Sequence, residues 1–466
     1  MLFCSFEYAI FLPTVFLLYW NARKRQRQNL VIAVASYVFY GWWDWRFLSL
    51  IALTSTSSYF AGRLMSQSSR LQRRRLICRA SVAINLLVLA TFKYYDFFVS
   101  SLTGLLSIVG IHPDWVTLHL VVPVGISFYT FQAIGYTIDV YRRQIAAERD
   151  IVSFIAYISF FPQLVAGPIE QAKHLLPQFG KNRRFDAATA TDGLRQILWG
   201  LFKKMVVADN CAPVVDNVWS DLPLADGASL TAAMLLFAVQ IYGDFSGYSD
   251  IAAGSARLFG FELTDNFHYP YFATGLRDFW RRWHISLMRW LVDYVYIPLG
   301  GSRISSTTTI RNILVVFGVS GLWHGANWTF VAWGLYHGLL LVAERQLAKR
   351  YLHTSSAIGR TAVFVTVIAG WVLFRAPSLS AAADFFTLLI VQPWGRVPTD
   401  LLVPLTAAIF MFAAEWHSRR YRHALQVDSH TILGHRRILR RTIYIALLVA
   451  LSLFSGTQSQ FIYFQF

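Results

Sequence analysis

Ser320-Gly-Leu-Trp-His-Gly-Ala-Asn-Trp328 places one histidine between two apolar segments, residues 310–322 and 326–343. No charged residue lies near His324 in either segment. Apolar helices of about 20 residues cross a bilayer, and shorter ones are tolerated inside a membrane protein. An ionisable side chain at this depth is unfavourable unless it has a partner or a function. The stretch therefore predicts a membrane-embedded chain with a candidate site at His324.

The composition of the whole chain supports this interpretation. The chain has 466 residues, of which 55% are hydrophobic and only 14% are charged. Soluble domains usually have about 25% charged residues, so the composition excludes a disordered chain and disfavours an ordinary soluble enzyme. The net charge is +17, but the basic residues cluster between apolar segments, as the positive-inside rule produces. We therefore expect a lipid bilayer as partner and no nucleic acid.

The apolar segments predict an all-α polytopic membrane protein with about ten to thirteen transmembrane or re-entrant helices. We expect one membrane domain over residues 1–466, with a core at about 115–375 and C-terminal helices in 381–466. The candidate segments are residues 3–20, 29–42, 45–62, 80–99, 115–139, 151–166, 194–212, 229–243, 246–261, 310–322, 326–343, 359–375, 381–393, 400–416 and 441–455.

The basic runs predict the orientation in the membrane. Placing residues 21–28, 63–79, 142–149, 173–184, 345–350 and 419–441 in the cytoplasm lets the helices between them pair consistently. The first apolar stretch lacks a basic start, so it is expected to be an uncleaved span. The N-terminus and the aromatic tail Phe461–Phe466 would then lie outside the cytoplasm.

Residues 276–290 form a second candidate site. Wound as one helix, they place Arg277, Arg281, Arg282 and Arg289 on one face and tryptophans on the other, with His284 at the seam. Such a helix is typical of the membrane interface. Its basic face could anchor lipid headgroups or bind a phosphorylated acyl donor, and both interpretations stay open.

A third polar group interrupts the apolar region at Asp244, Ser246, Tyr248 and Asp250. These side chains predict either the wall of a polar cavity or a helix break, in which Asp250 would cap the following helix. A structural role is the favoured interpretation.

Other histidines and the cysteines carry weaker signals. His423 and Asp428 have the His-x4-Asp spacing of soluble glycerolipid acyltransferases, but a solvated loop is expected there. His337 is expected to pack in the core. Cys4, Cys78 and Cys211 are odd in number and far apart in the sequence, so they imply no disulfide framework, and no metal-ligand spacing occurs. Hydrolase, nucleotide-binding and zinc-protease motifs are also missing from the sequence.

Taken together, several stretches resemble the membrane-bound O-acyltransferases, especially the members that acetylate alginate and other exopolysaccharides. Each stretch alone is modest, and the ordered set is specific. They are Phe160-Phe-Pro-Gln-Leu-Val-Ala-Gly-Pro168, Tyr242-Gly-Asp-Phe-Ser-Gly-Tyr-Ser-Asp250, Asn266-Phe-His-Tyr-Pro-Tyr271, Asp278-Phe-Trp-Arg-Arg-Trp-His-Ile-Ser286, Tyr296-Ile-Pro-Leu-Gly-Gly301, Gly321-Leu-Trp-His-Gly-Ala326 and the aromatic tail.

The resemblance implies a fold with helices around a central funnel and tunnel, and it implies roles for individual residues. His324 would be the catalytic histidine, and His284 would occupy a second signature position that is Asn, Asp or His in the superfamily. The donor, acetyl-CoA, would be a substrate, with no bound cofactor and no metal. Its binding and the tunnel wall would involve Lys203, Arg281, Arg282, Trp283, Trp323, Asn327 and Trp328. Gln171 departs from the family pattern, where a basic residue is expected.

The implied function is O-acetylation of an extracytoplasmic polysaccharide, such as alginate or cellulose, by an enzyme of the bacterial inner membrane. A periplasmic partner with a serine esterase-type (SGNH) site and a polysaccharide synthase or secretion complex would complete the pathway. Transfer of D-alanyl or lipid acyl groups remains an alternative. A transporter with an intramembrane His/Asp pathway is the alternative from another class.

Overall fold

The structure is a computed structural model that describes residues 1–113, 115–165, 167–347, 356–395, 397, 399–428, 430–455 and 459–464. The described residues form helices and no strand, which confirms the all-α expectation. Residues 348–350 of one predicted basic run and residues 465–466 of the tail lie outside these ranges. The chain forms two compact units, one of Met1–Ala187 with Ala256–Leu263 and the other of Ala188–Ser255 with Thr264–Phe466.

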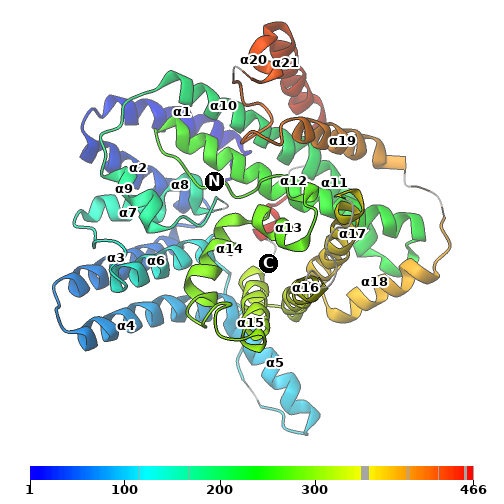
Figure 1. The fold of residues 1–466 in the computed structure, drawn as a ribbon, viewed down its shortest axis with the longest axis horizontal. Helices are drawn as coiled ribbons and strands as arrows, with labels where there is room; N and C mark the ends of the chain where they lie inside the picture. The colour runs from blue at the N-terminus through cyan, green and yellow to red at the C-terminus, as the bar shows by residue number, and fades with distance from the viewer. Residues whose placement is uncertain are drawn as a thin grey trace. The chain divides into compact units, whose positions relative to one another are not determined.

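The first unit contains three mutually packed helices, α3, α4 and α6, and a second group in which α2 packs on α1 and α7 (Figure 1). Asn29 fastens the second group, since its side-chain amide donates to the Ser153 hydroxyl at 2.8 Å and to the Phe179 carbonyl at 3.0 Å. The elements are α1 (Phe6–Asn21), α2 (Arg25–Gly41), η1 (Trp45–Phe47), α3 (Leu48–Ser66), α4 (Leu71–Leu89), η2 (Ala90–Tyr94), α5 (Tyr95–Ile108), α6 (Ile126–Tyr141), α7 (Ile151–Ser159), α8 (Phe161–Leu164) and α9 (Ala172–Phe179).

The second unit is built around the long helix α12 and the helix pair α15–α16. Its elements are α10 (Ala187–Leu201), η3 (Phe202–Ala208), α11 (Asp209–Ser220), η4 (Leu222–Leu224), α12 (Gly227–Leu258), η5 (Pro270–Phe272), α13 (Leu276–Arg282), α14 (Ile285–Leu291), η6 (Val292–Tyr296), α15 (Ser306–His324), α16 (Trp328–Leu347), α17 (Ser356–Arg375), α18 (Leu379–Val391), η7 (Thr399–Leu401), α19 (Leu402–His417), α20 (Ile432–His435), α21 (Arg437–Phe454) and η8 (Ile462–Phe464).

Helices α15 and α16 approach closely because two glycines face the opposite backbone. A Cβ on Gly321 would lie 2.2 Å from the carbonyl oxygen of Phe330, and one on Gly334 would lie 2.1 Å from that of Phe317. Only glycine leaves room for such backbone contact. The pair therefore fixes the end of α15, where His324 is the last residue.

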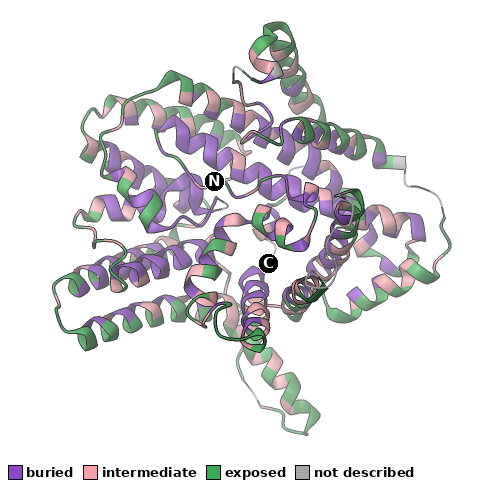
Figure 2. Ribbon diagram, viewed as in Figure 1, coloured by how far each residue is buried: buried purple, intermediate pink, exposed green. Residues whose placement is uncertain are grey.

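Among the residues that the structure describes, three helices are long and apolar enough to cross a membrane, namely Leu71–Ile108, Gly227–Leu258 and Ala357–Arg375. Figure 2 shows α5 and α21 largely exposed, whereas most of α12 is buried. Predicted boundaries are wrong in several places, and the segment expected over residues 115–139 becomes helical only at Ile126. Residues 229–243 and 246–261 do not form separate segments, because α12 runs through them, and residues 276–290 divide into α13 and α14.

Candidate active site

His324 lies in a box of aromatic rings within the second unit. The residue is 3% exposed. Its ring centroid lies 5.0 Å from those of Trp323 and Trp333, 5.3 Å from that of Phe374 and 5.4 Å from that of Tyr463. These four rings surround the imidazole with apolar surface and exclude bulk water from it, which suits proton transfer in a dry site.

His284 joins His324 in the same site, although 40 residues separate them in the sequence. Their ring centroids are 6.2 Å apart, and Trp323 contacts both. His284 lies between α13 and α14 with φ 44°, a left-handed conformation that is uncommon for a residue other than glycine. Such a backbone persists only where its surroundings hold it, and it recurs at functional sites.

Asn266 provides that hold. Its Oδ1 lies 3.0 Å from His284 Nδ1 and accepts from the Ser286 hydroxyl at 2.9 Å and from the Ser286 backbone N–H at 3.3 Å. The Asn266 backbone carbonyl also accepts from Ile285 N–H at 2.9 Å. One asparagine thus fastens the first turn of α14 and the ring of the histidine that precedes it.

This geometry determines which nitrogen of His284 carries the proton. A backbone N–H can only donate, so the Asn266 atom that faces Ser286 is the carbonyl oxygen. That oxygen can only accept, so His284 Nδ1 is protonated and Nε2 of the neutral ring bears a lone pair. His284 lies outside the three candidate spans, and burial lowers its pKa from the ordinary value to about 3. The ring is therefore neutral near pH 7.

A narrow polar pocket lies beside Asn266 in the second unit. Lys203, Ser246, Asp250 and Glu415 contribute to its lining. Its free volume of about 20 Å³ is enough for a water molecule but not for an acyl donor. Ser246 and Asp250 thus line a polar cavity. Of the two interpretations of the sequence, a cavity wall or a helix break, this is the cavity wall.

The lysines of η3 neutralise the carboxylates of this region. Lys203 Nζ lies 2.6 Å from Asp250, and Lys204 Nζ lies 2.7 Å from Asp209 and 2.9 Å from Asp244. Helix α12 continues through Asp244 and Asp250 because these partners compensate their charge, so the predicted helix break is wrong. Asp250 lies inside α12 and does not cap a helix. Lys203 has a carboxylate partner already, so its predicted contact with donor phosphates stays a prediction.

Tyr248 belongs to an aromatic contact with the C-terminal tail. Its ring centroid lies 4.3 Å from that of Phe461, and Ile462 N–H donates to Asp244 at 2.7 Å. The tail therefore packs back into the site and brings Tyr463 to both histidines, at 5.4 Å from His324 and 6.5 Å from His284. The sequence motif included Tyr463 but gave no indication of this contact.

The basic residues of 276–290 lie on the exposed side, as predicted, but not on one helix. Arg277, Arg281 and Arg289 are exposed, and Arg282 pairs with Asp278 at 2.8 Å. The single interfacial helix is wrong because the chain turns at His284, which is buried at 1% exposure and does not lie at a seam. Trp283 is buried too, with its ring 4.8 Å from that of Trp371.

The residues predicted to wall a tunnel separate into two groups. Trp323 lies between the two histidines. Trp328 is 52% exposed and does not contribute to the aromatic box. Asn327 caps α16, since its Oδ1 accepts from Thr329 N–H at 3.1 Å and its amide donates to the Pro377 carbonyl at 3.0 Å.

The sequence predictions for three further polar residues, His337, His423 and Gln171, can be compared with their locations in the structure. His337 is buried among rings, 5.0 Å from Trp280 and 5.2 Å from Trp333, consistent with core packing. The prediction of a solvated loop at His423 is wrong, because that residue is 2% exposed and its Nε2 lies 3.3 Å from Asp192. Gln171 is buried and precedes α9.

Comparison with known proteins identifies the family. Residues 142–382 match the membrane-bound O-acyltransferase family. The chain is 36% identical to the probable alginate O-acetylase AlgI of Pseudomonas putida over 98% of both chains. It is 32% identical to the peptidoglycan O-acetyltransferase of Helicobacter pylori over 98% of this chain and 95% of that protein. A teichoic acid D-alanyltransferase of Streptococcus thermophilus is 27% identical over 47% of this chain and 56% of its own.

The matched region contains His284, His324 and the residues that pack between them, so the family assignment and the two-histidine geometry concern the same part of the chain. The chain belongs to the membrane-bound O-acyltransferase family and is a membrane O-acyltransferase.

Proposed function

We propose that this protein takes an acetyl group from acetyl-CoA in the cytoplasm and passes it across the bacterial inner membrane for O-acetylation of an extracytoplasmic polysaccharide. The observation that carries the proposal is the pair of buried imidazoles with centroids 6.2 Å apart. The similarity to proteins named alginate O-acetylase and peptidoglycan O-acetyltransferase supports acetyl as the group and a polysaccharide as the acceptor.

His324 acts as the general base in this scheme. It takes the proton of the acceptor hydroxyl while the hydroxyl oxygen attacks the thioester carbonyl carbon. The tetrahedral intermediate then expels the thiolate, the C–S bond breaks, and the proton passes to sulfur. The rings of Trp323, Trp333, Phe374 and Tyr463 limit competing hydrolysis by keeping water from the thioester.

His284 acts as a neutral hydrogen-bond acceptor. With Nδ1–H committed to Asn266, its Nε2 lone pair accepts from a hydroxyl or amide N–H of the bound substrate and orients it. A neutral Nε2 acceptor has no proton to donate, so His284 does not stabilise negative charge on the thioester oxygen in this scheme. Asn266 is accordingly a positioning residue.

The proposal also assigns a donor-binding surface, an orientation in the membrane and partner proteins. Arg277, Arg281 and Arg289 offer an exposed basic surface that suits the phosphates of the donor. The N-terminus would lie in the periplasm. A periplasmic esterase-like (SGNH) acetyltransferase would receive the acyl group, and a polysaccharide synthase or secretion complex would supply the acceptor.

Sided proteoliposomes test this proposal. Acetyl-CoA labelled on the acetyl carbonyl is added outside vesicles that enclose alginate oligosaccharides and the purified periplasmic partner. We expect labelled oligosaccharide inside the vesicles, and none from vesicles that lack the protein. Label released only as free acetate outside, with none inside even after prolonged incubation, would overturn transfer across the membrane.

The similarity to teichoic acid D-alanyltransferase makes D-alanyl transfer the second candidate. The same vesicles discriminate the two when the external donor is a D-alanyl thioester on a carrier protein. Transfer from that donor but not from acetyl-CoA would replace the acetyl proposal by the D-alanyl one.

A further inference from the structure

The first unit contains a basic pocket that the proposed acetyl transfer does not use. It lies between α9, the loop that follows it and the turn after α12, and has a volume of about 520 Å³. Lys181, Arg183 and Arg184 line it together with His174 and Glu262. Residues 173–184 also form one of the basic runs that the sequence places in the cytoplasm.

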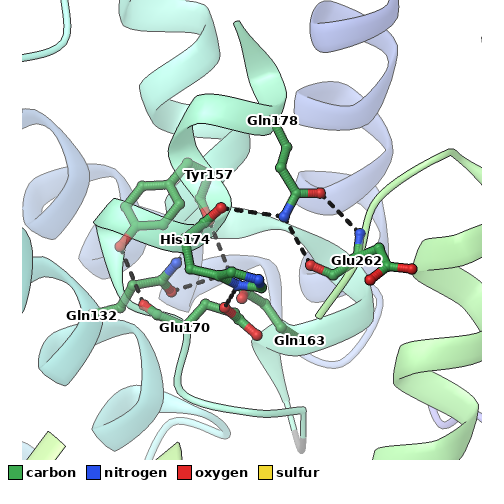
Figure 3. A network of polar contacts seen from close by, with 7 residues as sticks. All are labelled: Gln132, Tyr157, Gln163, Glu170, His174, Gln178 and Glu262. Atoms are coloured by element: carbon green, nitrogen blue, oxygen red, sulfur yellow. Dashed lines mark hydrogen bonds and ion pairs between the residues drawn. The ribbon is translucent and has the colours of Figure 1, made fainter. Parts of the chain in front are cut away.

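The walls of this pocket are held by a polar network (Figure 3). The Gln178 side chain donates to the Glu262 carbonyl and accepts from Glu262 N–H, both at 2.9 Å, which ties α9 to the turn. His174 Nδ1 lies 2.7 Å from the carboxylate of Glu170, whose side chain is fully buried. The Tyr157 hydroxyl in turn donates to the Glu170 carbonyl at 3.3 Å. The pocket is thus preformed.

Arg183 is fixed as one wall. Its guanidinium carbon lies 4.7 Å from the ring centroid of Phe261, and that ring packs on Phe179 at 4.6 Å. The guanidinium donates to the Gln178 carbonyl at 3.0 Å and to Asn29. A stacked, hydrogen-bonded arginine is pre-organised for binding an oxyanion.

The charge in this pocket is not balanced by the protein. Lys181, Arg183 and Arg184 face one lining carboxylate, Glu262, and in the described part of the chain none of the three has an ion pair. The buried Nε of Arg183 has no hydrogen-bond partner among the described residues. A half-buried cation in this state favours an anionic ligand, because unpaired buried charge is unfavourable.

We propose that this pocket binds a phosphate group carried on a small polar body. Phosphate matches guanidinium and ammonium donors, and the volume exceeds what a bare ion needs. An anionic lipid headgroup and a soluble phosphorylated compound share this chemistry. The inference is independent of acetyl transfer, since all its residues belong to the first unit and none takes part in the two-histidine site.

Two double variants test the site with binding as the readout. Lys181→Ala/Arg184→Ala removes two exposed cations that line the pocket and leaves the Arg183 framework intact. Arg73→Ala/Arg75→Ala removes two exposed cations from α4, outside the pocket, and is the matched control. Pyrophosphate is titrated by calorimetry, and retention of phosphatidylglycerol over phosphatidylcholine is measured by native mass spectrometry from mixed nanodiscs.

We expect the wild type to bind at least one of the two probes, and the pocket variant to bind it roughly tenfold more weakly while the α4 variant is unchanged. Binding of pyrophosphate alone would identify a soluble ligand, and retention of phosphatidylglycerol alone would identify a lipid; both support the site. Absence of binding to both probes, or an equal loss in the two double variants, would overturn it.

Discussion

Two buried polar clusters in the second unit handle charge in opposite ways. In one cluster, Lys204 lies 2.7 Å from Asp209 and 2.9 Å from Asp244, so opposite charges are paired directly. In the other, the neutral Asn266 and His284 are joined by a hydrogen bond, and His324 lies among aromatic rings. The first cluster holds α12, η3 and the C-terminal tail together, because Lys204 also donates to the Ser459 carbonyl at 3.1 Å. The second has neutral side chains and aromatic rings in place of ion pairs.

Buried polar groups in the first cluster are structural, whereas those in the second suit catalysis. A buried charge with two partners of opposite sign is fully paired, and removing one partner leaves an uncompensated charge in the low-dielectric interior. A neutral imidazole held through one nitrogen stays in place while its other nitrogen can exchange hydrogen bonds with substrate. Variants of the first cluster should therefore affect folding, and variants of the second should affect turnover.

The largest effect is expected for Lys204→Met. The substitution leaves Asp209 and Asp244 buried without their cation, which should destabilise the protein by about 3–5 kcal/mol. Thermal unfolding in detergent measures this, with Lys204→Arg as the control that keeps the charge. Wild-type stability of Lys204→Met would show that the cluster does not hold the fold.

His284→Ala should lower kcat by about 10²-fold in the protein that folds, because it removes the Nε2 acceptor and also the Nδ1–H that fastens the ring to Asn266. His284→Gln can bring an amide oxygen near the position of Nε2 and should retain more activity. Steady-state acetyl transfer measures both. Equal activity of His284→Ala and wild type would leave the residue a purely structural role.

Asn266→Asp should change the pH dependence of turnover. A carboxylate beside Nδ1–H favours the imidazolium and raises the pKa of His284 from about 3 towards neutrality. The lone pair on Nε2 is then lost as pH falls through the raised pKa, so the variant should gain an acidic limb between about pH 5 and pH 8. Asn266→Ala should lose about tenfold in rate without that limb. Parallel profiles for wild type and Asn266→Asp would contradict the positioning role.

The smallest effect is expected for Trp328→Ala. This side chain is 52% exposed and lies outside the aromatic box, so acetyl transfer should change by less than about twofold. Trp323→Ala is the comparison, because that ring contacts both histidines and its loss should lower the rate at least tenfold. Similar losses of acetyl transfer rate in the two variants would support the predicted location of Trp328 in the tunnel wall.

The sequence predicted the helical membrane class because hydropathy and the clustering of basic residues follow from the bilayer itself. It missed the continuity of α12 because the η3 partners of Asp244 and Asp250 lie 40 and 47 residues earlier in the sequence. It also missed the turn at His284, where tertiary hydrogen bonds from Asn266 override helical periodicity. Both errors arise from contacts distant in sequence.

The sequence predicted only part of the candidate site, because other parts of it also depend on contacts between residues distant in sequence. His324 was recognisable because a histidine flanked by glycines stands out in an apolar stretch. Asn266 and Tyr463 occur in motifs that the sequence singled out, but their contacts with the histidines depend on folding of the loop before α13 and of the tail. The buried location of His423 likewise depends on Asp192, more than 200 residues away.

The role of His324 as the general base is decided by the rate of thioester-dependent acetyl transfer in two matched histidine variants. His324 and His337 are both buried and both contact Trp333, at 5.0 Å and 5.2 Å, so their replacement by alanine creates similar cavities. We expect His324→Ala to lose about 10³-fold in kcat, and His337→Ala, folded to the same extent, to lose less than about fivefold. Equal rates in the two variants would contradict the assignment of His324 as the base.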